Sequence, residues 1–196
     1  MTSILVVCSG NICRSPVAEG LLRRGVQRRF GSDAPEVSSA GTIGLEGSSA
    51  TPESVQAAAE RGVDISSHVA RRLTAPMIER ADLLVCMAAE HRAAIATRLP
   101  AALDRTFTLK ELGRLLEHDA PASLLSGDAL GARIAAAADA RRGGGPANPY
   151  DEDVVDPLGM PLETYRAIAW ELDDWIDRLL AGLFGPVPAG VAGEGT

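Results

Sequence analysis

A short loop near the N-terminus restricts the possible fold more than any other feature of this chain. Ile4 to Val7 is an apolar, branched run, which predicts a buried parallel strand. The segment that follows reads Cys8-Ser9-Gly10-Asn11-Ile12-Cys13-Arg14-Ser15-Pro16. Ser15 can cap a helix, and Pro16 suits the first helical position. Between a strand and a helix, backbone N–H groups converge on one point, so the loop can bind phosphate, sulfate or arsenate, and the same positive field favours a nucleophilic thiolate at Cys8.

A second cysteine, Cys86, also has an arginine six positions later, so the bare spacing is weak evidence. The stretch after Cys86 has no glycine and carries Glu90 where an anion would sit, which favours a core thiol at the end of a buried strand. A buried core thiol is also the alternative for Cys8. Gly10, which lets the backbone turn with its N–H groups inward, and Asn11, which tolerates unusual dihedral angles, favour the anion site instead.

The stretch from Cys8 to Pro16, together with Ala18 and Glu19, resembles the phosphate loop of the low-molecular-weight protein tyrosine phosphatases. Three further segments resemble parts of that family in the family's order: Ser38-Ser39-Ala40-Gly41-Thr42, Ser67-His68-Val69-Ala70-Arg71 and Asp156-Pro157. The resemblance covers roughly residues 3 to 113 and 150 to 183. The order of four separate segments makes it far more specific than any one motif.

This chemistry needs a nucleophile, a cation and an acid. We expect Cys8 to attack phosphorus, while the planar fork of Arg14 binds equatorial oxygens. Asp156 is the expected acid for the leaving oxygen, because Pro157 biases it toward an extended conformation on a rigid loop; Asp153 is the alternative. No metal or cofactor is required. The remaining phosphate contacts are expected from the backbone of Ser9, Gly10, Asn11, Ile12 and Cys13.

The resemblance also implies supporting roles. Asn11, Ser39 and His68 match positions that brace the loop by hydrogen bonds, and Ser15 matches a hydroxyl that stabilises the thiolate. Without the resemblance, the prediction of a bracing role for His68 would have less support, since a histidine after two serines is more often a surface or capping residue.

Cys13 has two interpretations. It could trap an oxidised Cys8 as a reversible disulfide, or it could be a structural thiol packed under the loop. The chain has three cysteines, two of them in one loop, so we expect no disulfide framework. There is no basic, apolar start typical of a signal peptide and no run of transmembrane length, and we therefore expect a cytoplasmic protein.

The pattern beyond the loop predicts alternating strands and helices. Strands are expected at 36–40, 83–87 and 105–109, and helices at 16–30, 51–62, from the third strand to about 99, and at 110–117. This alternation predicts an α/β fold, a doubly wound four-stranded parallel sheet with helices on both faces. The loop after strand one then lies at the carboxyl edge, near a reversal of strand order, where such sheets bind ligands.

We expect a single phosphatase domain over 1–184, closed by a long helix at 162–183, and a disordered tail over 185–196. An inserted segment at about 118–149, with an alanine-rich helix at 128–142, is either a lid over the site or a surface insertion. The net charge of −7, with a single lysine, argues against nucleic acid or an anionic membrane as partner. We expect a monomer.

Three positions depart from the family pattern. Leu45 and Leu158 stand where aromatic residues commonly line the substrate cleft, and Ala88 replaces a common acidic residue. Tyr150 could supply a replacement wall. The leading function is a cysteine-dependent phosphomonoesterase acting on phosphotyrosine in proteins through a phosphocysteine intermediate. Alternatives are a phosphoarginine phosphatase, a phosphatase of small phosphomonoesters, an arsenate reductase, or a phosphate-binding or thiol-redox sensor module without turnover.

Overall fold

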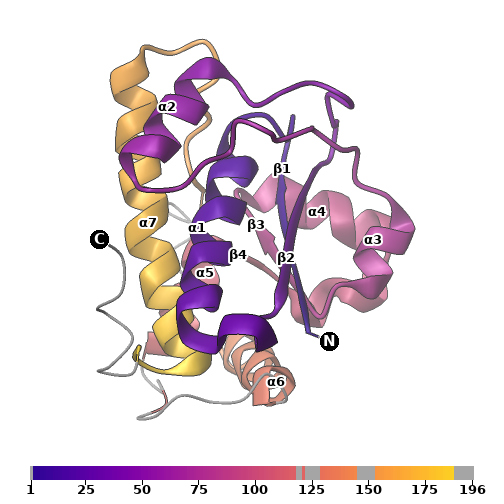
Figure 1. Ribbon diagram of the computed structural model, residues 1–196. Coiled ribbons are helices and arrows are strands. Elements are labelled where there is room, and N and C mark those ends of the chain that lie inside the picture. The colour runs from indigo at the N-terminus through magenta and orange to yellow at the C-terminus, as the bar shows by residue number, and fades with distance from the viewer. Residues whose placement is uncertain (1, 118–120, 122–128, 145–152, 188–196) are drawn as a thin grey trace.

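The computed structural model describes residues 2–117, 121, 129–144 and 153–187. Its centre is a sheet of four parallel strands in the order β2-β1-β3-β4. The strands are β1 (Ser3–Cys8), β2 (Glu36–Gly41), β3 (Leu83–Cys86) and β4 (Thr106–Thr108). Since β2 and β3 lie on opposite sides of β1, the strand order reverses beside β1 (Figure 1). This confirms the predicted doubly wound parallel sheet.

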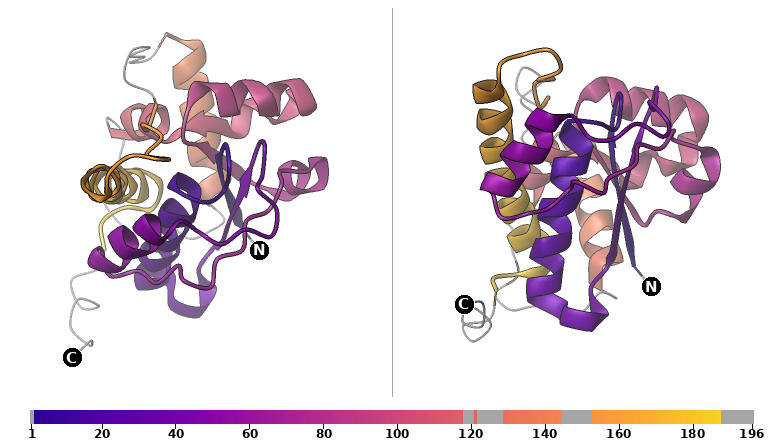
Figure 2. Two further views of the ribbon diagram at one scale, coloured as in Figure 1. Left: turned by 90° about the horizontal axis from the view of Figure 1, so that it is seen from above. Right: turned by 45° about the horizontal axis from the view of Figure 1, so that its top comes forward.

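Helices cover both faces of the sheet (Figures 1 and 2). Along β1, Ile4, Val6 and Cys8 belong to one hydrophobic core and Leu5 and Val7 to the other, as the alternation of side chains in a strand requires. One side holds α1 (Arg14–Phe30), α2 (Pro52–Glu60), α5 (Leu109–Glu117) and α7 (Leu162–Phe184). The other side holds α3 (Ala75–Arg80) and α4 (Ala89–Arg98).

The start of α1 corrects one expectation. The helix begins at Arg14 with Cys13 as its N-cap residue, so Ser15 is not the cap and Pro16 is not the first helical residue. Ser15 lies inside the first turn, where its hydroxyl contacts Cys8 instead of the backbone. Pro16 is tolerated there because the first-turn N–H groups have no partner within the helix. The short elements α3, η1 (Gly31–Asp33) and η2 (Pro100–Arg105) were not predicted.

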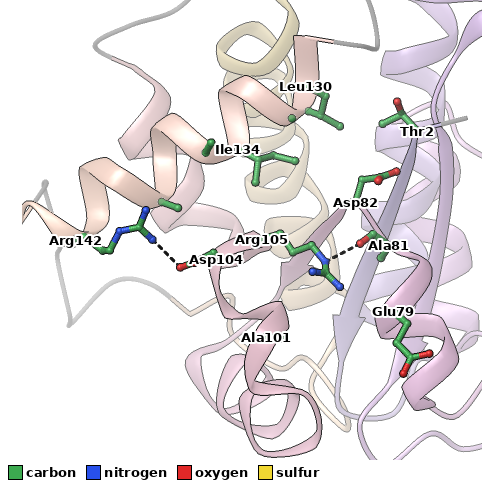
Figure 3. A pocket seen from close by; sticks show the side chains of 13 residues that line it. Thr2, Glu79, Ala81, Asp82, Ala101, Asp104, Arg105, Leu130, Ile134 and Arg142 are labelled. Carbon is green, nitrogen blue, oxygen red and sulfur yellow. Dashed lines mark hydrogen bonds and ion pairs between the residues drawn. The ribbon is translucent and has the colours of Figure 1, made fainter.

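The helix expected in the insertion is α6 (Leu130–Arg142), which lies at the edge where the strands begin. Its Arg141 donates to the carbonyls of Leu103 and Thr106, beside the start of β4. A cavity of about 680 Å³ lies between part of α6 and that edge (Figure 3), lined in part by Thr2, Asp82, Arg105, Leu130 and Ile134. Because Cys8 ends β1, this helix lies at the opposite edge and is not a lid over the phosphate loop. The rest of the insertion and positions 188–196 of the expected tail lie outside the described residues.

Candidate active site

The backbone of the loop after β1 is oriented by its carbonyl groups. The carbonyls of Cys8, Ser9 and Gly10 accept hydrogen bonds from the backbone of residues 42–45 at 2.9 to 3.1 Å. The carbonyl of Ile12 accepts from Thr51 N at 2.9 Å. In a trans peptide the N–H points opposite to the preceding carbonyl, so these outward carbonyls direct the following N–H groups into the loop. Together with the N-terminus of α1, they form a cradle for an anion.

Gly41 lets the second strand approach this cradle closely. A Cβ atom at Gly41 would lie 2.5 Å from the carbonyl oxygen of Ser9 and 3.0 Å from the backbone N of Asn11. Both atoms are backbone atoms, which cannot move aside without deforming the loop. A side chain at this position would therefore separate the loop from the segment that binds its carbonyls.

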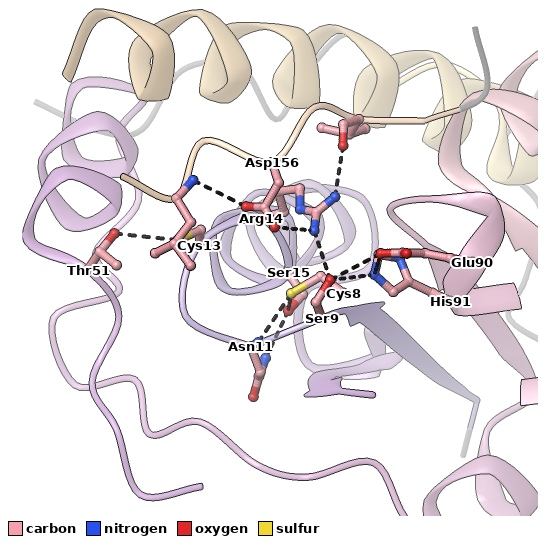
Figure 4. Close-up of polar contacts among 12 residues, drawn as sticks. Cys8, Ser9, Asn11, Cys13, Arg14, Ser15, Thr51, Glu90, His91 and Asp156 are labelled. Atoms are coloured by element: carbon pink, nitrogen blue, oxygen red, sulfur yellow. Dashed lines mark hydrogen bonds and ion pairs between the residues drawn. The ribbon is translucent and has the colours of Figure 1, made fainter. Parts of the chain in front are cut away.

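Hydrogen-bond donors surround the sulfur of Cys8. The backbone N–H of Asn11 donates to Cys8 Sγ at 3.3 Å, and the Ser15 hydroxyl lies 2.9 Å from the same sulfur (Figure 4). Asn11 has a φ of +60°, in the left-handed region that asparagine tolerates better than most residues. Its side-chain amide donates to Ser15 Oγ at 2.9 Å, which leaves the serine proton free to donate to the sulfur.

The residues expected to brace the loop contact it directly. Asn11 Nδ2 donates to Ser39 Oγ at 2.8 Å, and Asn11 Oδ1 accepts from Arg71 N at 2.8 Å. His68 Nε2 lies 2.8 Å from the carbonyl oxygen of Asn11. Both polar atoms of the buried Asn11 side chain therefore have hydrogen-bond partners. Ser39 Oγ in turn donates to Glu19 Oε2 at 2.5 Å.

Arg14 and Asp156 meet at the mouth of the loop. Arg14 Nη2 lies 2.7 Å from Asp156 Oδ2, and Nη1 donates to the carbonyl of Val154 at 2.9 Å. The guanidinium is buried, whereas the carboxylate is about half exposed. Arg14 Nε is buried without a hydrogen-bond acceptor among the described residues. An orphaned N–H on a buried cation at this point is what an oxygen of a bound phosphate would satisfy.

The other residues expected near the acid have different surroundings. Asp153 Oδ1 accepts from the backbone N of Ala89 at 2.7 Å and thereby caps α4. Leu45 and Leu158 are 44% and 56% exposed. Leu45 Cδ1 lies 3.6 Å from the point where a Cβ of Gly10 would be, so this leucine borders the phosphate loop. Tyr150, the expected replacement wall, lies outside the described residues.

Comparison with known proteins identifies the family. A profile described as low molecular weight phosphotyrosine protein phosphatase matches residues 3–119. The chain belongs to this family. It is 42% identical over 110 residues to the probable low molecular weight protein-tyrosine-phosphatase EpsP of Ralstonia nicotianae, a match that covers 56% of this chain and 72% of the relative. It is 33% identical over 178 residues to a protein-arginine-phosphatase of Geobacillus stearothermophilus, covering 90% of this chain and 92% of that protein.

A solved structure supports the same assignment. The low molecular weight protein tyrosine phosphatase from T. tengcongensis matches with a TM-score of 0.68 and 31% identity, and the match covers 92% of this chain and 98% of that one. The resemblance stated from the sequence is thereby confirmed, and the chain is a hydrolase of the low-molecular-weight phosphatase type. One of these relatives is named a protein-tyrosine-phosphatase and the other a protein-arginine-phosphatase.

Three structural observations concern metal binding, membrane-spanning helices and Cys86. Within the described residues of this phosphatase, no group of three His, Cys, Asp or Glu side chains could hold a metal ion. No helix in the same part of the chain is both long and apolar enough to cross a membrane. Cys86 is fully buried at the end of β3, and burial raises the pKa of its thiol strongly, so the prediction of a core thiol is confirmed.

Sequence reasoning missed two residues beside the phosphate loop, Glu90 and His91. Ser9 Oγ lies 2.9 Å from His91 Nε2 and 3.3 Å from Glu90 Oε1 (Figure 4). Both residues belong to the first turn of α4, after β3. Because β3 is parallel to β1 and adjacent to it, the segments that follow the two strands meet at one edge. That topological rule was the available signal.

The Cys13 side chain lies beside Thr51, the N-cap residue of α2. Its Sγ lies 3.7 Å from Thr51 Oγ1, and burial raises the pKa of the Cys13 thiol above its ordinary value. At neutral pH the thiol is therefore protonated, which is the unreactive form. Any reaction of Cys13 with an oxidised Cys8 should become faster as the pH rises toward the elevated pKa.

This yields a redox prediction. Mild peroxide should inactivate the wild-type phosphatase reversibly through a Cys8 to Cys13 disulfide, whereas Cys13→Ser should be inactivated irreversibly. The fraction of wild-type activity that can be recovered should be larger at higher pH. Activity recovered after addition of a thiol reductant, with peptide mapping of both cysteines, is the measurement. Free Cys13 together with sulfinic Cys8 in oxidised wild type would show that Cys13 does not protect.

Proposed function

We propose that this chain hydrolyses phosphotyrosine in proteins, with Cys8 as nucleophile, Arg14 as phosphate ligand and Asp156 as general acid. The observation that carries the proposal is the buried guanidinium of Arg14, whose Nε lacks an acceptor among the described residues, beside a loop whose carbonyls point outward. A phosphate would satisfy both. The sulfur of Cys8, at the end of β1, is the nucleophile within this cradle.

The first chemical step transfers the phosphoryl group to sulfur. The Cys8 thiolate attacks phosphorus, an S–P bond forms, and the bond between phosphorus and the ester oxygen breaks. The leaving oxygen takes the proton of Asp156 and departs as an alcohol or phenol. Charge on the three equatorial oxygens is stabilised by the loop N–H groups and by Arg14, which are already oriented before the reaction.

Substrate binding would also release the acid. Asp156 is paired with Arg14 Nη2 at 2.7 Å. A phosphate dianion that binds Nε and Nη2 competes for the same donor and weakens the pair. The Asp156 side chain is then free to approach the leaving oxygen and donate its proton. In the second step its carboxylate takes a proton from water, whose oxygen attacks phosphorus and displaces Cys8.

The surroundings of the loop favour an aryl substrate. Ile43 and Leu45 follow β2 and are hydrogen-bonded through their backbone to the loop, and Val155 and Leu158 flank the acid. All four side chains are exposed. Large apolar side chains gathered around a polar cradle suit a flat, apolar ring better than a charged group. This supports phosphotyrosine as the leading substrate.

One observation favours phosphoarginine as the second candidate. The Glu90 carboxylate, whose side chain is 71% exposed, lies 3.3 Å from Ser9 Oγ at the edge of the loop. An exposed carboxylate so close to the phosphate site could accept hydrogen bonds from a guanidinium. A relative that is 33% identical is named a protein-arginine-phosphatase.

A panel of phosphotyrosine, phosphoserine, phosphoarginine and sugar phosphates tests the proposal. We expect the highest kcat/KM on a phosphotyrosine peptide. The variant Glu90→Gln should leave that value within a few-fold but should lower kcat/KM on phosphoarginine if the carboxylate binds the guanidinium. Faster turnover of phosphoarginine than of phosphotyrosine would replace the leading substrate, and no turnover of any phosphomonoester would refute the proposed function.

The exposed leucine beside the acid makes a further prediction. Wild-type recognition of phosphotyrosine should be weak, and Leu158→Tyr should lower KM on a phosphotyrosine peptide, because an aromatic pair contributes about 0.5 to 1.5 kcal/mol beyond buried area. That corresponds to roughly a twofold to tenfold change. Leu103→Tyr is the matched control, since Leu103 is similarly exposed but lies on η2, before β4. A low wild-type KM with no gain in Leu158→Tyr would mean that the cleft already has an aromatic wall.

A further inference from the structure

Ser9 Oγ is a junction between the phosphate loop and α4 (Figure 4). Three groups surround this single oxygen. Arg14 Nη2 donates to it at 3.1 Å, His91 Nε2 lies 2.9 Å away, and Glu90 Oε1 lies 3.3 Å away. The roles assigned so far to Cys8, Arg14 and Asp156 do not use His91, although this histidine is only 1% exposed.

Hydrogen-bond accounting assigns the protons of this junction. A serine hydroxyl has one proton to donate and two lone pairs. Arg14 can only donate to it, and the carboxylate of Glu90 can only accept. Each of these three groups complements Ser9 Oγ when His91 Nε2–H donates to it and the Ser9 proton goes to Glu90, whose Oε1 also lies 3.3 Å from His91 Nε2. In this tautomer His91 Nδ1 carries only a lone pair. The other tautomer would place an N–H at His91 Nδ1, which is buried and has no partner in the part of the chain that the structure describes.

The surroundings of His91 keep the ring neutral. Burial, together with the positive charge of Arg14, lowers the pKa of His91 to about 4, against the smaller opposing effects of Glu90, Asp153 and Asp156. A neutral ring carries one proton, and the accounting places that proton at Nε2. The ring can therefore act as a fixed donor to Ser9 at neutral pH without adding a second cation beside Arg14.

The histidine is itself held in place by the loop that carries the acid. His91 N donates to the carbonyl of Ala88 at 3.1 Å, in the first turn of α4. That turn is capped by Asp153, and Val154 N donates to the carbonyl of Met87 at 2.7 Å. The phosphate loop, the start of α4 and the acid loop thus meet around the guanidinium of Arg14.

We propose that His91 is a positioning residue for Arg14, which it holds through Ser9 Oγ. The inference rests on the proposed function of the same site. When phosphate displaces Asp156 from Nη2, the carbonyl of Val154 and the oxygen of Ser9 remain as the anchors of the guanidinium. A serine oxygen fixed by His91 and Glu90 keeps the plane of Arg14 facing the cradle, whereas a freely rotating hydroxyl would not.

A double-mutant cycle on phosphate affinity tests this coupling. The variants are Ser9→Ala, His91→Phe, which removes the donor, and the double variant, with His91→Gln as the conservative variant whose amide can donate to Ser9. The readouts are the competitive inhibition constant of inorganic phosphate against p-nitrophenyl phosphate, the Kd of phosphate by calorimetry, kcat and thermal stability.

We expect each single variant to weaken phosphate binding by roughly threefold to tenfold, the scale of one hydrogen bond, and the double variant by no more than the larger single change. His91→Gln should restore binding to within about twofold of wild type, on the same scale. A merely structural role would lower thermal stability without changing phosphate affinity. If His91→Phe does not fold, His91→Ala, which also lacks the donor, takes its place in the cycle and is compared with His91→Gln.

Failure of the positioning role of His91 can be distinguished from failure of the proposed phosphatase function. Unchanged phosphate affinity in Ser9→Ala, or losses that multiply in the double variant, would overturn the positioning role while the wild type remains an active phosphatase. A wild type that binds phosphate without hydrolysing any ester would refute the proposed function, and the cycle on Kd would still test His91. A wild type that neither binds phosphate nor hydrolyses an ester would end both.

Discussion

Replacing Cys8 by serine should abolish hydrolysis of an aryl phosphate while phosphate binding persists. Serine keeps the size of the side chain but is a far weaker nucleophile than a thiolate at neutral pH. The loss of kcat should be on the order of 10⁵-fold or more, the scale seen when a hydrolase loses its nucleophile. The loop N–H groups and Arg14 are unaffected, so calorimetry should still detect inorganic phosphate.

Cys86→Ala is the matched control for the thiol. Cys86 is buried at the end of β3 and faces the other hydrophobic core, so this variant should lose stability and retain activity. Arg14→Lys should lower kcat/KM by roughly 10² to 10³-fold, since lysine cannot bind phosphate with a planar fork while it also contacts Val154 and Ser9. Full activity in Cys8→Ser would rule out the phosphocysteine route.

Replacing Asp156 by asparagine should lower kcat by roughly 10² to 10⁴-fold for an ester with a poor leaving group, which is the usual contribution of a positioned acid. The asparagine oxygen can still accept a hydrogen bond from Arg14, but the amide has no acidic proton for the leaving oxygen. For p-nitrophenyl phosphate, whose leaving group departs without protonation, the loss should be much smaller. Steady-state kinetics on phenyl phosphate and p-nitrophenyl phosphate give the comparison.

Asp153→Asn separates the two candidate acids. Asp153 caps α4 through the backbone N of Ala89, and asparagine can form the same cap. We therefore expect a small change that is equal for both leaving groups. An equal loss for both esters in Asp156→Asn, with a leaving-group dependence in Asp153→Asn, would transfer the acid role to Asp153.

The secondary structure was largely predictable because it depends on neighbours in the sequence. Branched apolar runs predicted β1 and β3, and the periodic apolar face of residues 162–183 predicted α7. The predicted N-terminus of α1 was wrong because Ser15, a good capping residue by local chemistry, contacts Cys8 and Asn11 instead. When a polar side chain can form either a local cap or a buried tertiary hydrogen bond, the buried hydrogen bond is the stronger of the two.

The sequence by itself determined the cradle, because Cys8 to Arg14 are contiguous and the strand and helix that flank them follow from local patterns. Only the tertiary structure decided which groups meet Arg14. Asp156 lies 142 residues away, His91 lies 82 residues from Ser9, and α6 lies at the opposite edge of the sheet. These placements depend on the parallel pairing of β3 with β1 and on the packing of the acid loop against α4, which no local pattern encodes.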